Sequence, residues 1–437
     1  MSGAAPVAEL AIVGGGMVGA CLALALADTL AASGRRIVLL EATPPETGQS
    51  PSFDGRTSAL SNGSRRILET LGVWSEVAAQ AAPISRIHIS DRGRFGAARI
   101  DAAEQGLAAM GYVVPNRVLG AALWARLEGH PGVELRTPCR VVGLQREAAQ
   151  VQLSLDDGST VAARLVVAAD GAQSVVREAA GVTATAEDYG QVALITQVSA
   201  GRPHEGVAYE RFTTSGPIAV LPLPPALGHQ RVATVWTLAP AEAARVRALD
   251  DAAFLAELQQ AFGWRLGRFA APGERLAYPL ALVQSASLVS ERVAIIGNAA
   301  QGLHPIAGQG FNLGLRDAIT LAECVADALA RRDAAVNADA STQAAADPGS
   351  DAVLQRYAEW RAADRRLLVR FTDGLVKLFG ARLGPLRAAR SFGLSLFDVL
   401  PAAKAAMSTL STGGGGELPR LARGLPLRRG VVPEVAP

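Results

Sequence analysis

The sequence predicts an α/β fold made of a Rossmann-like domain, an inserted antiparallel sheet and a C-terminal helical region. Three observations predict it. A glycine-rich strand–turn–helix unit opens the chain, the pattern changes to short alternating strands between residues 192 and 237, and a helical amphipathic pattern runs from residue 351 to about 411. With 437 residues, the chain is long enough for two or three domains.

The first unit has the pattern of a dinucleotide-binding turn. An apolar strand run, 10–13, precedes the turn and a helical run follows it. The glycines Gly14, Gly16 and Gly19 fit the G-x-G-x-x-G fingerprint, in which they allow a tight turn, close approach to a pyrophosphate and close helix packing. A second strand ends in Glu41, at the spacing where an acidic side chain takes a ribose hydroxyl.

The middle of the chain alternates short elements. We expect a helical stretch from Asp54 to Leu71, helices at 118–127 and 252–262, and strands at 84–90, 133–136, 140–144, 151–155, 160–163, 164–169, 192–198, 206–212, 217–222 and 231–237. An Ala-, Asp- and Ser-rich segment, about 331–351, predicts a flexible insertion.

A second glycine-rich loop, 297–310, follows a short apolar run and leads into a helix. It presents backbone N–H groups and a helix N-terminus to a negative group, and its glycines let the backbone approach a flat ligand. Strand–helix connections usually run about two to six residues. This longer loop, stiffened by Pro305, is therefore a candidate ligand site.

Other single positions are open to two interpretations. Asp170 and Gly171 close a buried strand, where strand ends meet ligands, although Asp-Gly by itself is usually a turn. Arg56 and Arg117 could bind phosphates with their forks or remain solvated. His304 could act as acid, base or hydrogen-bond donor, or could be a packing residue of the loop.

Composition excludes several classes of protein. A net charge of +2 gives no argument for nucleic acid. The three cysteines contain no C-x-x-C, and the five histidines show no metal spacing, so a disulfide framework and a metal site are unsupported. Cys21 and Cys324 are expected to be small core residues. The apolar run 10–27 breaks into strand, turn and helix, so we expect no transmembrane helix.

These motifs, in this order, resemble the FAD-dependent aromatic hydroxylases, the class A flavoprotein monooxygenases related to p-hydroxybenzoate hydroxylase. The resemblance spans nearly the whole chain. Asp54-Gly55-Arg56 and the run from His304 to Asp317 resemble the ubiquinone-biosynthesis hydroxylase branch. Asn298 stands where most of the superfamily has aspartate, and the Gly-Asn-Ala-Ala-Gln form is similar to the enzymes that hydroxylate 2-octaprenyl-6-methoxyphenol.

The resemblance implies FAD as cofactor, NADPH or NADH as co-substrate, and O₂ and a polyprenylated phenol as substrates. A flavin C4a-hydroperoxide would hydroxylate the ring. The resemblance places His304 and Pro305 in a flavin-facing catalytic loop. The residues implied in FAD binding are Gly14, Gly16, Gly19, Glu41, Arg56, Arg117, Asp170, Gly171, Asn298, Gly308, Gln309, Gly310, Phe311 and Asn312.

The expected FAD-binding domain comprises residues 1–85, 115–190 and 286–335. The expected substrate domain comprises 86–114 and 191–285, and residues 336–437 form the insertion and the C-terminal helices. We expect a cytoplasmic protein that is either free or peripherally bound to the inner face of the membrane, alone or within a quinone-biosynthesis complex. Tail arginines such as Arg420 and Arg423 are the candidates for contact with anionic lipid.

Related flavoproteins compete with this interpretation. Flavin halogenases carry a W-x-W-x-I-P segment that is missing here, and disulfide reductases need C-x-x-C. A different ring position, a prenyl reductase that consumes no O₂, and a non-catalytic FAD-loaded scaffold all stay open.

Overall fold

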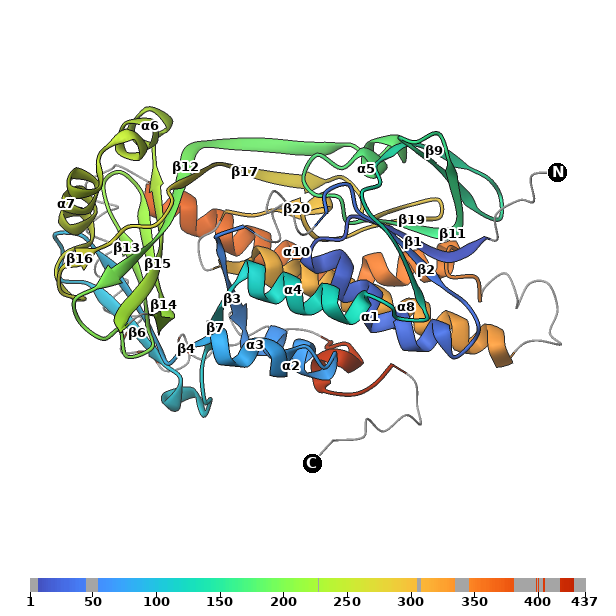
Figure 1. Ribbon diagram of the computed structural model, residues 1–437, viewed down its shortest axis with the longest axis horizontal. Coiled ribbons are helices and arrows are strands. Elements are labelled where there is room, and N and C mark those ends of the chain that lie inside the picture. The colour runs from blue at the N-terminus through green and yellow to red at the C-terminus, as the bar shows by residue number, and fades with distance from the viewer. Residues whose placement is uncertain are drawn as a thin grey trace.

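The computed structural model describes residues 7–44, 54–226, 228–304, 308–334, 346–380 and 417–427, together with Asp398, Leu400 and Lys404. The predicted α/β class is confirmed: a mainly parallel sheet and a mainly antiparallel sheet lie at opposite ends of an elongated molecule (Figure 1).

The first sheet has the parallel order β19–β11–β1–β2–β8 at its centre. β1 and β2 are buried along their whole length, as is typical of central strands in a parallel sheet. The strands of this sheet are β1 (Ala8–Val13), β2 (Ile37–Leu40), β8 (Val133–Arg136), β9 (Val141–Arg146), β10 (Val151–Leu155), β11 (Thr160–Ala168), β18 (Val289–Ser290) and β19 (Val293–Ile295). The two runs expected at 160–163 and 164–169 form the single strand β11.

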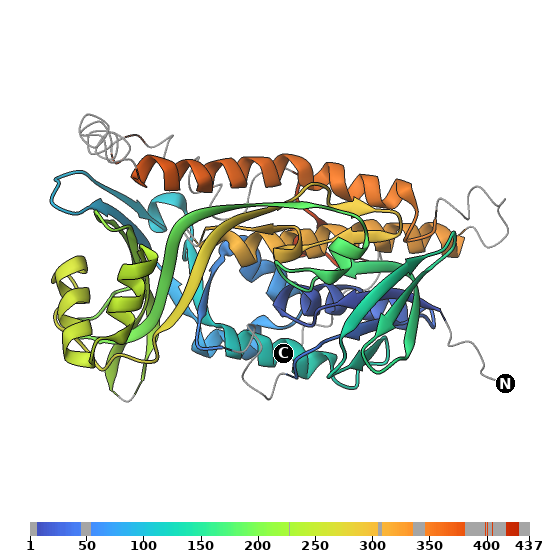
Figure 2. The same cartoon turned by 90° about the horizontal axis from the view of Figure 1, so that it is seen from above.

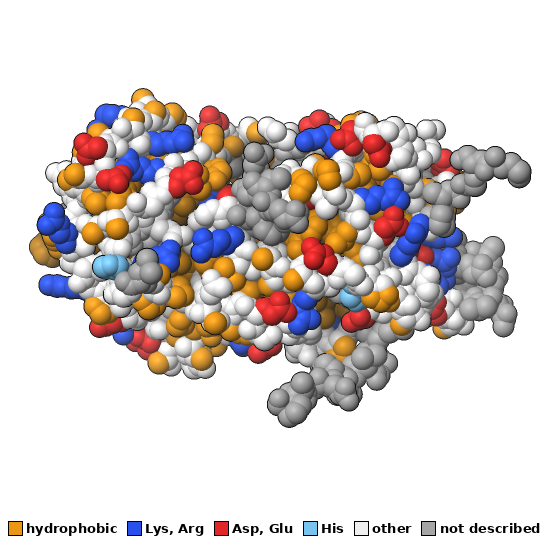
Figure 3. Space-filling view, viewed as in Figure 1, with side chains coloured by type: hydrophobic (Ala, Val, Ile, Leu, Met, Phe, Trp, Pro, Cys, Tyr) orange, Lys and Arg blue, Asp and Glu red, His pale blue; other side chains and the backbone are white. Residues whose placement is uncertain are grey.

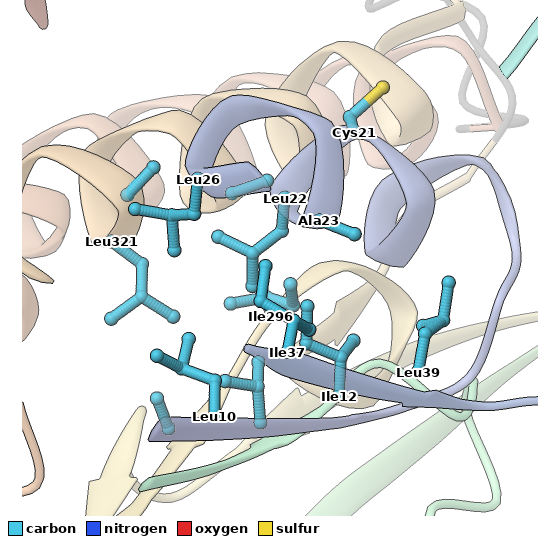
Figure 4. Close-up of a cluster of buried hydrophobic side chains, with 14 of the residues drawn as sticks. Leu10, Ile12, Cys21, Leu22, Ala23, Leu26, Ile37, Leu39, Ile296 and Leu321 are labelled. Atoms are coloured by element: carbon cyan, nitrogen blue, oxygen red, sulfur yellow. The ribbon is translucent and has the colours of Figure 1, made fainter. Parts of the chain in front are cut away.

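Two helices pack closely over this sheet. Leu22 and Leu26 of α1 (Met17–Ala31) lie toward Leu10 of β1, with Leu321 of α8 (Gln309–Ala334) beside them (Figure 4). The helices approach one another at Gly314, where a Cβ atom would lie 2.9 Å from Val18. The other helices of this end are α2 (Asn62–Thr70), α3 (Trp74–Val77), α4 (Asn116–Leu127) and α5 (Val175–Ala179).

The second sheet has the order β20–β17–β12–β15–β14–β13–β5–β6, with β16 paired to β12. All of its pairs are antiparallel except β13 with β5. Helices α6 (Pro240–Ala248) and α7 (Asp251–Phe262) cover one face. The strands are β5 (Arg86–Asp91), β6 (Ala97–Asp101), β12 (Ala184–Ala200), β13 (Val207–Phe212), β14 (Pro217–Ala226), β15 (His229–Leu238), β16 (Phe269–Ala270), β17 (Leu276–Ser285) and β20 (Gln301–Gly302).

One long ribbon joins the two ends of the molecule. β12 has 17 residues and pairs with β17 from Ala184 to Ile195, so the two strands run together from the first sheet into the second (Figure 2). The sequence pattern detected only the second part of β12.

The helix expected from Asp54 to Leu71 is wrong in its first part. Residues Thr57–Ser61 form β3, which pairs with β7 (Gly111–Pro115), and β4 (Ala82–Ile84) completes a three-stranded sheet. Only α2 is helical, and the Ser61 hydroxyl caps it by accepting the Ser64 N–H. Pairing with a distant strand overrides the local helical pattern here.

The C-terminal helical region includes α10 (Asp351–Gly380), which lies along α8. Short 3-10 turns are η2 (Ala78–Gln80), η3 (Ala103–Gln105), η4 (Gly297–Ala299) and η6 (Arg420–Arg423).

Most of the expected insertion, 335–345, lies outside the described residues. Among the helices of the described ranges, none is both long and apolar enough to cross a membrane. Cys21 and Cys324 are buried, as predicted.

Candidate active site

The predicted motifs gather along one edge of the first sheet. Gly14 follows β1, Glu41 follows β2, Asp170 lies just after β11 and Gly297 lies just after β19. Because these four strands are parallel, their carboxyl ends share one edge, which is where open α/β sheets bind ligands. We call these residues and the turns they belong to the glycine edge.

The first turn of the glycine edge can form only because glycine, which has no side chain, occupies two of its positions. Gly14 has φ +105°, and a Cβ there would collide with the Ala169 carbonyl. A Cβ on Gly19 would collide with the Gly14 carbonyl, so the start of α1 can lie against the turn only with glycine. Gly16 is the N-cap of α1 and has no side chain that could cap the helix.

Glu41 and Trp124 hold this turn in place. Glu41 Oε2 accepts the Gly15 N–H at 2.6 Å, and its Oε1 accepts the Thr43 N–H at 2.9 Å. Trp124 of α4 donates its Nε1–H to the Gly15 carbonyl at 2.8 Å. Arg117 lies seven residues earlier on α4, on the same side of the helix, and is exposed. Its position leaves it free to reach toward the turn from the start of α4.

Asp170 has an incomplete set of partners. Its Oδ2 accepts the Val176 N–H at 3.2 Å, whereas Oδ1 is buried without a hydrogen-bond partner in the described chain. Burial raises the pKa of this carboxyl. Gly171 beside it has φ +89°, and a Cβ there would meet nothing within 4 Å. A buried acceptor next to open space is a place where a ligand hydroxyl can bind.

The second glycine loop is held by Asn312 on α8. Its Oδ1 accepts the Ser61 N–H at 2.8 Å and the Ser64 hydroxyl at 2.7 Å, and its Nδ2 donates to the Ala59 and Gly308 carbonyls, both at 2.9 Å. An asparagine amide offers about four hydrogen bonds, so this side chain is fully used within the protein. Its contribution to a ligand site is to position the loop.

The start of α8 is open toward a ligand. A Cβ on Gly310 would meet nothing within 4 Å, whereas Gly308 already touches β3, since a Cβ there would lie 2.9 Å from Ala59 Cβ. Gln309 is buried and Phe311 packs on the core. On the preceding turn, Asn298 is exposed and Asp317 accepts the Gly297 N–H at 3.2 Å.

Arg56 lies where the two ends of the molecule meet. Its Nε is 2.5 Å from Asp54 Oδ2, and its guanidinium stacks over the ring of Tyr278 on β17 at 4.6 Å. Gln197 of β12 also donates to the Gly55 carbonyl at 3.2 Å. The structure therefore places Arg56 between the glycine edge and the second sheet, already engaged by protein groups.

His304 is buried at the same junction. Its Nε2 is 3.3 Å from Gln191 Oε1, and its ring contacts Tyr189 edge-on at 5.3 Å between centroids. Tyr189 in turn donates to Asp373 of α10 at 3.4 Å. Burial lowers the pKa of His304 to about 4, so the imidazole is neutral at pH 7. Pro305 lies outside the described residues.

The sequence did not reveal one further candidate, Glu210 on β13. It stands in a cross-strand row on the face of the second sheet that α6 and α7 leave uncovered, and the other members of the row are apolar. In strand order the row is Ala98, Ile89, Glu210, Ala219, Val235 and Ile195. We call this row the sheet face.

The sheet face belongs to the side that meets the glycine edge. Gln197 and Tyr278, which contact the Asp54–Arg56 segment, share this side. Ala208, two residues from Glu210, packs in a core cluster with Ala59, which touches Gly308. The Glu210 carboxylate makes no hydrogen bond or ion pair with the described residues, and burial among apolar neighbours raises its pKa to about 7.

The arrangement fits an extended dinucleotide with a flat ring at one end. The glycine edge offers helix N-termini, an unpartnered Asp170 oxygen and open space at Gly171 and Gly310. Among the described residues, no cluster of His, Cys, Asp and Glu is placed to hold a metal. The site has the features expected for a bound dinucleotide cofactor.

Comparison with known proteins gives the class. Residues 7–353 match the FAD binding domain family, and the chain belongs to it. The p-nitrophenol 4-monooxygenase of Pseudomonas putida superposes with a TM-score of 0.71 over 92% of this chain and 96% of its own, at 19% identity, which shows the shared fold. The protein is an FAD-dependent monooxygenase that uses NADPH or NADH.

Within that class, the chain belongs to the ubiquinone-biosynthesis hydroxylases. It is 38% identical to the ubiquinone hydroxylase UbiL of Rhodospirillum rubrum, over 96% of this chain and 94% of that protein. It is 37% identical to the 3-demethoxyubiquinol 3-hydroxylase of Escherichia coli, over 88% and 93% respectively. The predicted family, cofactor and enzyme class are therefore confirmed. The individual site residues stay predictions.

Proposed function

We propose that this protein hydroxylates the ring of a polyprenylated phenol in ubiquinone biosynthesis, and that the ring lies between the glycine loop at Gly308 and the sheet face. One observation carries the proposal: an apolar sheet face with a single unpartnered carboxylate adjoins the loop that resembles a flavin-facing segment. An apolar surface suits a prenyl chain, and a lone acceptor suits the phenolic hydroxyl.

FAD, when bound and reduced, would activate O₂, which is the source of the oxygen atom that enters the ring. The residues proposed to hold it, directly or by positioning the backbone around it, are the fourteen glycine-edge, loop and arginine positions that the sequence predicted. Asn312 holds the loop, Gly310 leaves room beside it, and Asp170 Oδ1 accepts from a cofactor hydroxyl. Neutral His304 anchors the loop to β12 and serves as a positioning residue.

Glu210 is proposed to orient the ring. Its carboxylate accepts the hydrogen bond of the phenolic O–H, and it takes that proton as the ring becomes electron-rich. A group with a pKa near neutrality is suited to accept and later release a proton at physiological pH. The surrounding aliphatic side chains of the sheet face keep water away from the reacting ring.

The Glu210→Gln variant tests this role. We expect it to retain FAD and to lose about 100-fold in the rate of ring hydroxylation, because the amide cannot accept the proton. Glu128→Gln makes the same change of charge on an exposed helix end and should keep full activity. Normal hydroxylation by Glu210→Gln would remove Glu210 from the mechanism.

The class of reaction is tested with ¹⁸O₂. Purified enzyme, NADPH and a prenylated phenol should give a product that contains one labelled oxygen atom. Oxidation of NADPH with reduction of the prenyl chain and no label would identify a prenyl reductase. Full complementation of a deletion strain by a variant that cannot hold FAD would identify a scaffold.

We propose 2-octaprenyl-6-methoxyphenol as the ring substrate. The support is the Gly-Asn-Ala-Ala-Gln segment at residues 297–301, and the alternative is the ring position named in the E. coli relative. Profiling the phenols that accumulate in a deletion strain decides between them. Accumulation of 3-demethoxyubiquinol would overturn the 6-methoxyphenol assignment.

We also propose peripheral contact with the membrane and membership of a quinone-biosynthesis complex. The tail offers less support than the sequence suggested. Arg420 is paired with Glu323 and Asp327 of α8, at 3.4 and 3.0 Å, so its charge is engaged within the protein. Arg423 is exposed, and Arg428 and Arg429 lie outside the described residues.

A further inference from the structure

A second concave site lies at the far end of the molecule, on the α7 side of the second sheet and away from the sheet face. It is a pocket of about 260 Å³ between the β5–β6 hairpin and the turn after α7. Arg211 lies beneath that turn, since a Cβ on Gly263 would be 3.7 Å from its Nη1. We call this site the arginine pocket.

The arginine pocket holds uncompensated positive charge. It is lined by Arg94, Arg99, Arg211 and Arg265, against one acidic residue, Asp91. Asp398 binds Arg99 at 3.3 Å, but the other three arginines have no ion pair in the described ranges of the chain.

Hydrogen bonding inside the pocket is also incomplete. Arg211 Nε is buried without a hydrogen-bond partner among the described residues. Burial lowers the pKa of Arg211, and the positive charges of Arg265 and Arg92 lower it further. Burial also lowers the pKa of His88, on the same face, to about 4, with Arg265 and Arg99 contributing. Such a group of arginines is suited to bind an anion with several oxygens, because each guanidinium can donate two parallel hydrogen bonds to two of those oxygens.

Two exposed aromatic side chains flank the pocket. Phe95, at the tip of the hairpin, is fully exposed and lines the pocket, and Trp264, next to Arg265, is 66% exposed. The space-filling view shows arginine side chains beside exposed hydrophobic ones at this end of the molecule (Figure 3). Aromatic rings beside basic residues are typical of surfaces that enter the headgroup region of a membrane.

We propose that the arginine pocket binds a phosphate group, presented either by an anionic phospholipid or by a soluble phosphate. Phe95 and Trp264 favour the lipid, because a free anion in water gains nothing from exposed aromatic rings. Lipid binding here would hold the second sheet against the membrane surface, where a prenylated phenol resides.

The experiment has two arms on the full-length, FAD-loaded protein. In the first, co-sedimentation is measured with vesicles of phosphatidylcholine alone and of phosphatidylcholine mixed with phosphatidylglycerol. In the second, the melting temperature is measured in inorganic phosphate and in chloride of equal ionic strength. Binding to the mixed vesicles assigns the phosphate to lipid, and stabilisation by inorganic phosphate without vesicle binding assigns it to a soluble ligand. Response in neither arm overturns the proposal.

Matched variants locate the effect. Arg265→Gln should weaken vesicle binding about fivefold, the contribution of about one basic residue near an anionic surface. Arg66→Gln removes the same charge from exposed α2 and should change binding little. Both side chains are exposed, so both variants should fold. Equal losses in the two variants would show that net charge, not the pocket, attracts lipid, and would overturn the proposal.

The Phe95→Ser variant also distinguishes binding of an anionic phospholipid from binding of a soluble phosphate. It should weaken binding to mixed vesicles while leaving stabilisation by inorganic phosphate unchanged. Unchanged vesicle binding in this variant would overturn the lipid assignment. Because hydroxylation of a detergent-dispersed substrate should be unaffected in all these variants, failure of this inference is distinguishable from failure of the proposed activity.

Discussion

The glycine edge and the sheet face lie on two sides of the proposed site, and they are built in opposite ways. At the glycine edge, the site is formed by backbone groups. The side chains of Glu41, Trp124 and Asn312 form hydrogen bonds that hold this backbone in place. On the sheet face, one carboxylate stands among apolar side chains with no partner in the described chain. The difference predicts that changes at the closely packed positions of the glycine edge damage folding, whereas a change at Glu210 damages the chemistry without loss of folding.

The largest expected effect tests the first half of this comparison. Gly19→Ala places a methyl group against the Gly14 carbonyl and should cost about 4 kcal/mol of stability, or prevent folding, since overpacking of a rigid contact costs at least about 1–3 kcal/mol. Chemical denaturation measures it. Gly310→Ala adds the same methyl group where nothing lies within 4 Å. It should fold normally but hold FAD more weakly, and normal FAD affinity would contradict the placement of the ring beside Gly310.

At the junction of the two regions, His304 should make stability sensitive to acid. Its pKa is about 4 in the folded state and 6.5 when unfolded, so the unfolded chain binds more protons between these values. Stability is then lost as the pH falls from 6.5 to 4, by about 3 kcal/mol for this group. His304→Asn should remove that part of the pH dependence in denaturation curves. His229→Asn, on an exposed residue, should not.

Asn312→Ala should destabilise the protein by about 2 kcal/mol, because it leaves the Ser61 N–H and the Ala59 and Gly308 carbonyls without partners. Ser64→Ala removes one of the four hydrogen bonds of Asn312, together with a hydrogen bond from the Ser61 hydroxyl, but leaves the loop carbonyls paired and should cost less. Weakened FAD retention should accompany the loss in Asn312→Ala. If stability and FAD retention were both unchanged, the loop would not depend on this side chain.

The last effect has the opposite sign. Glu210 keeps its proton to about pH 7 when folded and loses it near 4.5 when unfolded, so stability falls as the pH rises through this window. Relative to low pH, Glu210→Gln should therefore gain about 3 kcal/mol over the native protein at pH 8, and at pH 4.5 the two should differ little. A destabilised variant at pH 8 would show that the carboxylate has a structural partner after all.

The same contrast explains what the sequence could reveal. The glycine edge was predictable because a local sequence pattern, the spacing of glycines after an apolar strand, determines its backbone geometry. Glu210 was not, since its neighbours Ala98, Ala219 and Ile195 are brought beside it only by strand pairing across the sheet. Its one local signal is the alternation of β13. Ala208 and Phe212, two residues before and after Glu210, point to the same side of the strand and are buried. β3 was assigned as helix for the same reason.

The β12–β17 ribbon has a mechanical consequence. A continuous pair of strands resists bending, so we expect little hinge motion between the two ends of the molecule. The ladder shifts register only between Asp188 and Gln191, beside Gly190 with φ +61°. Tyr189 and Gln191, which lie at this irregularity, contact His304, so we expect a change in the strand pairing here to reach His304 first.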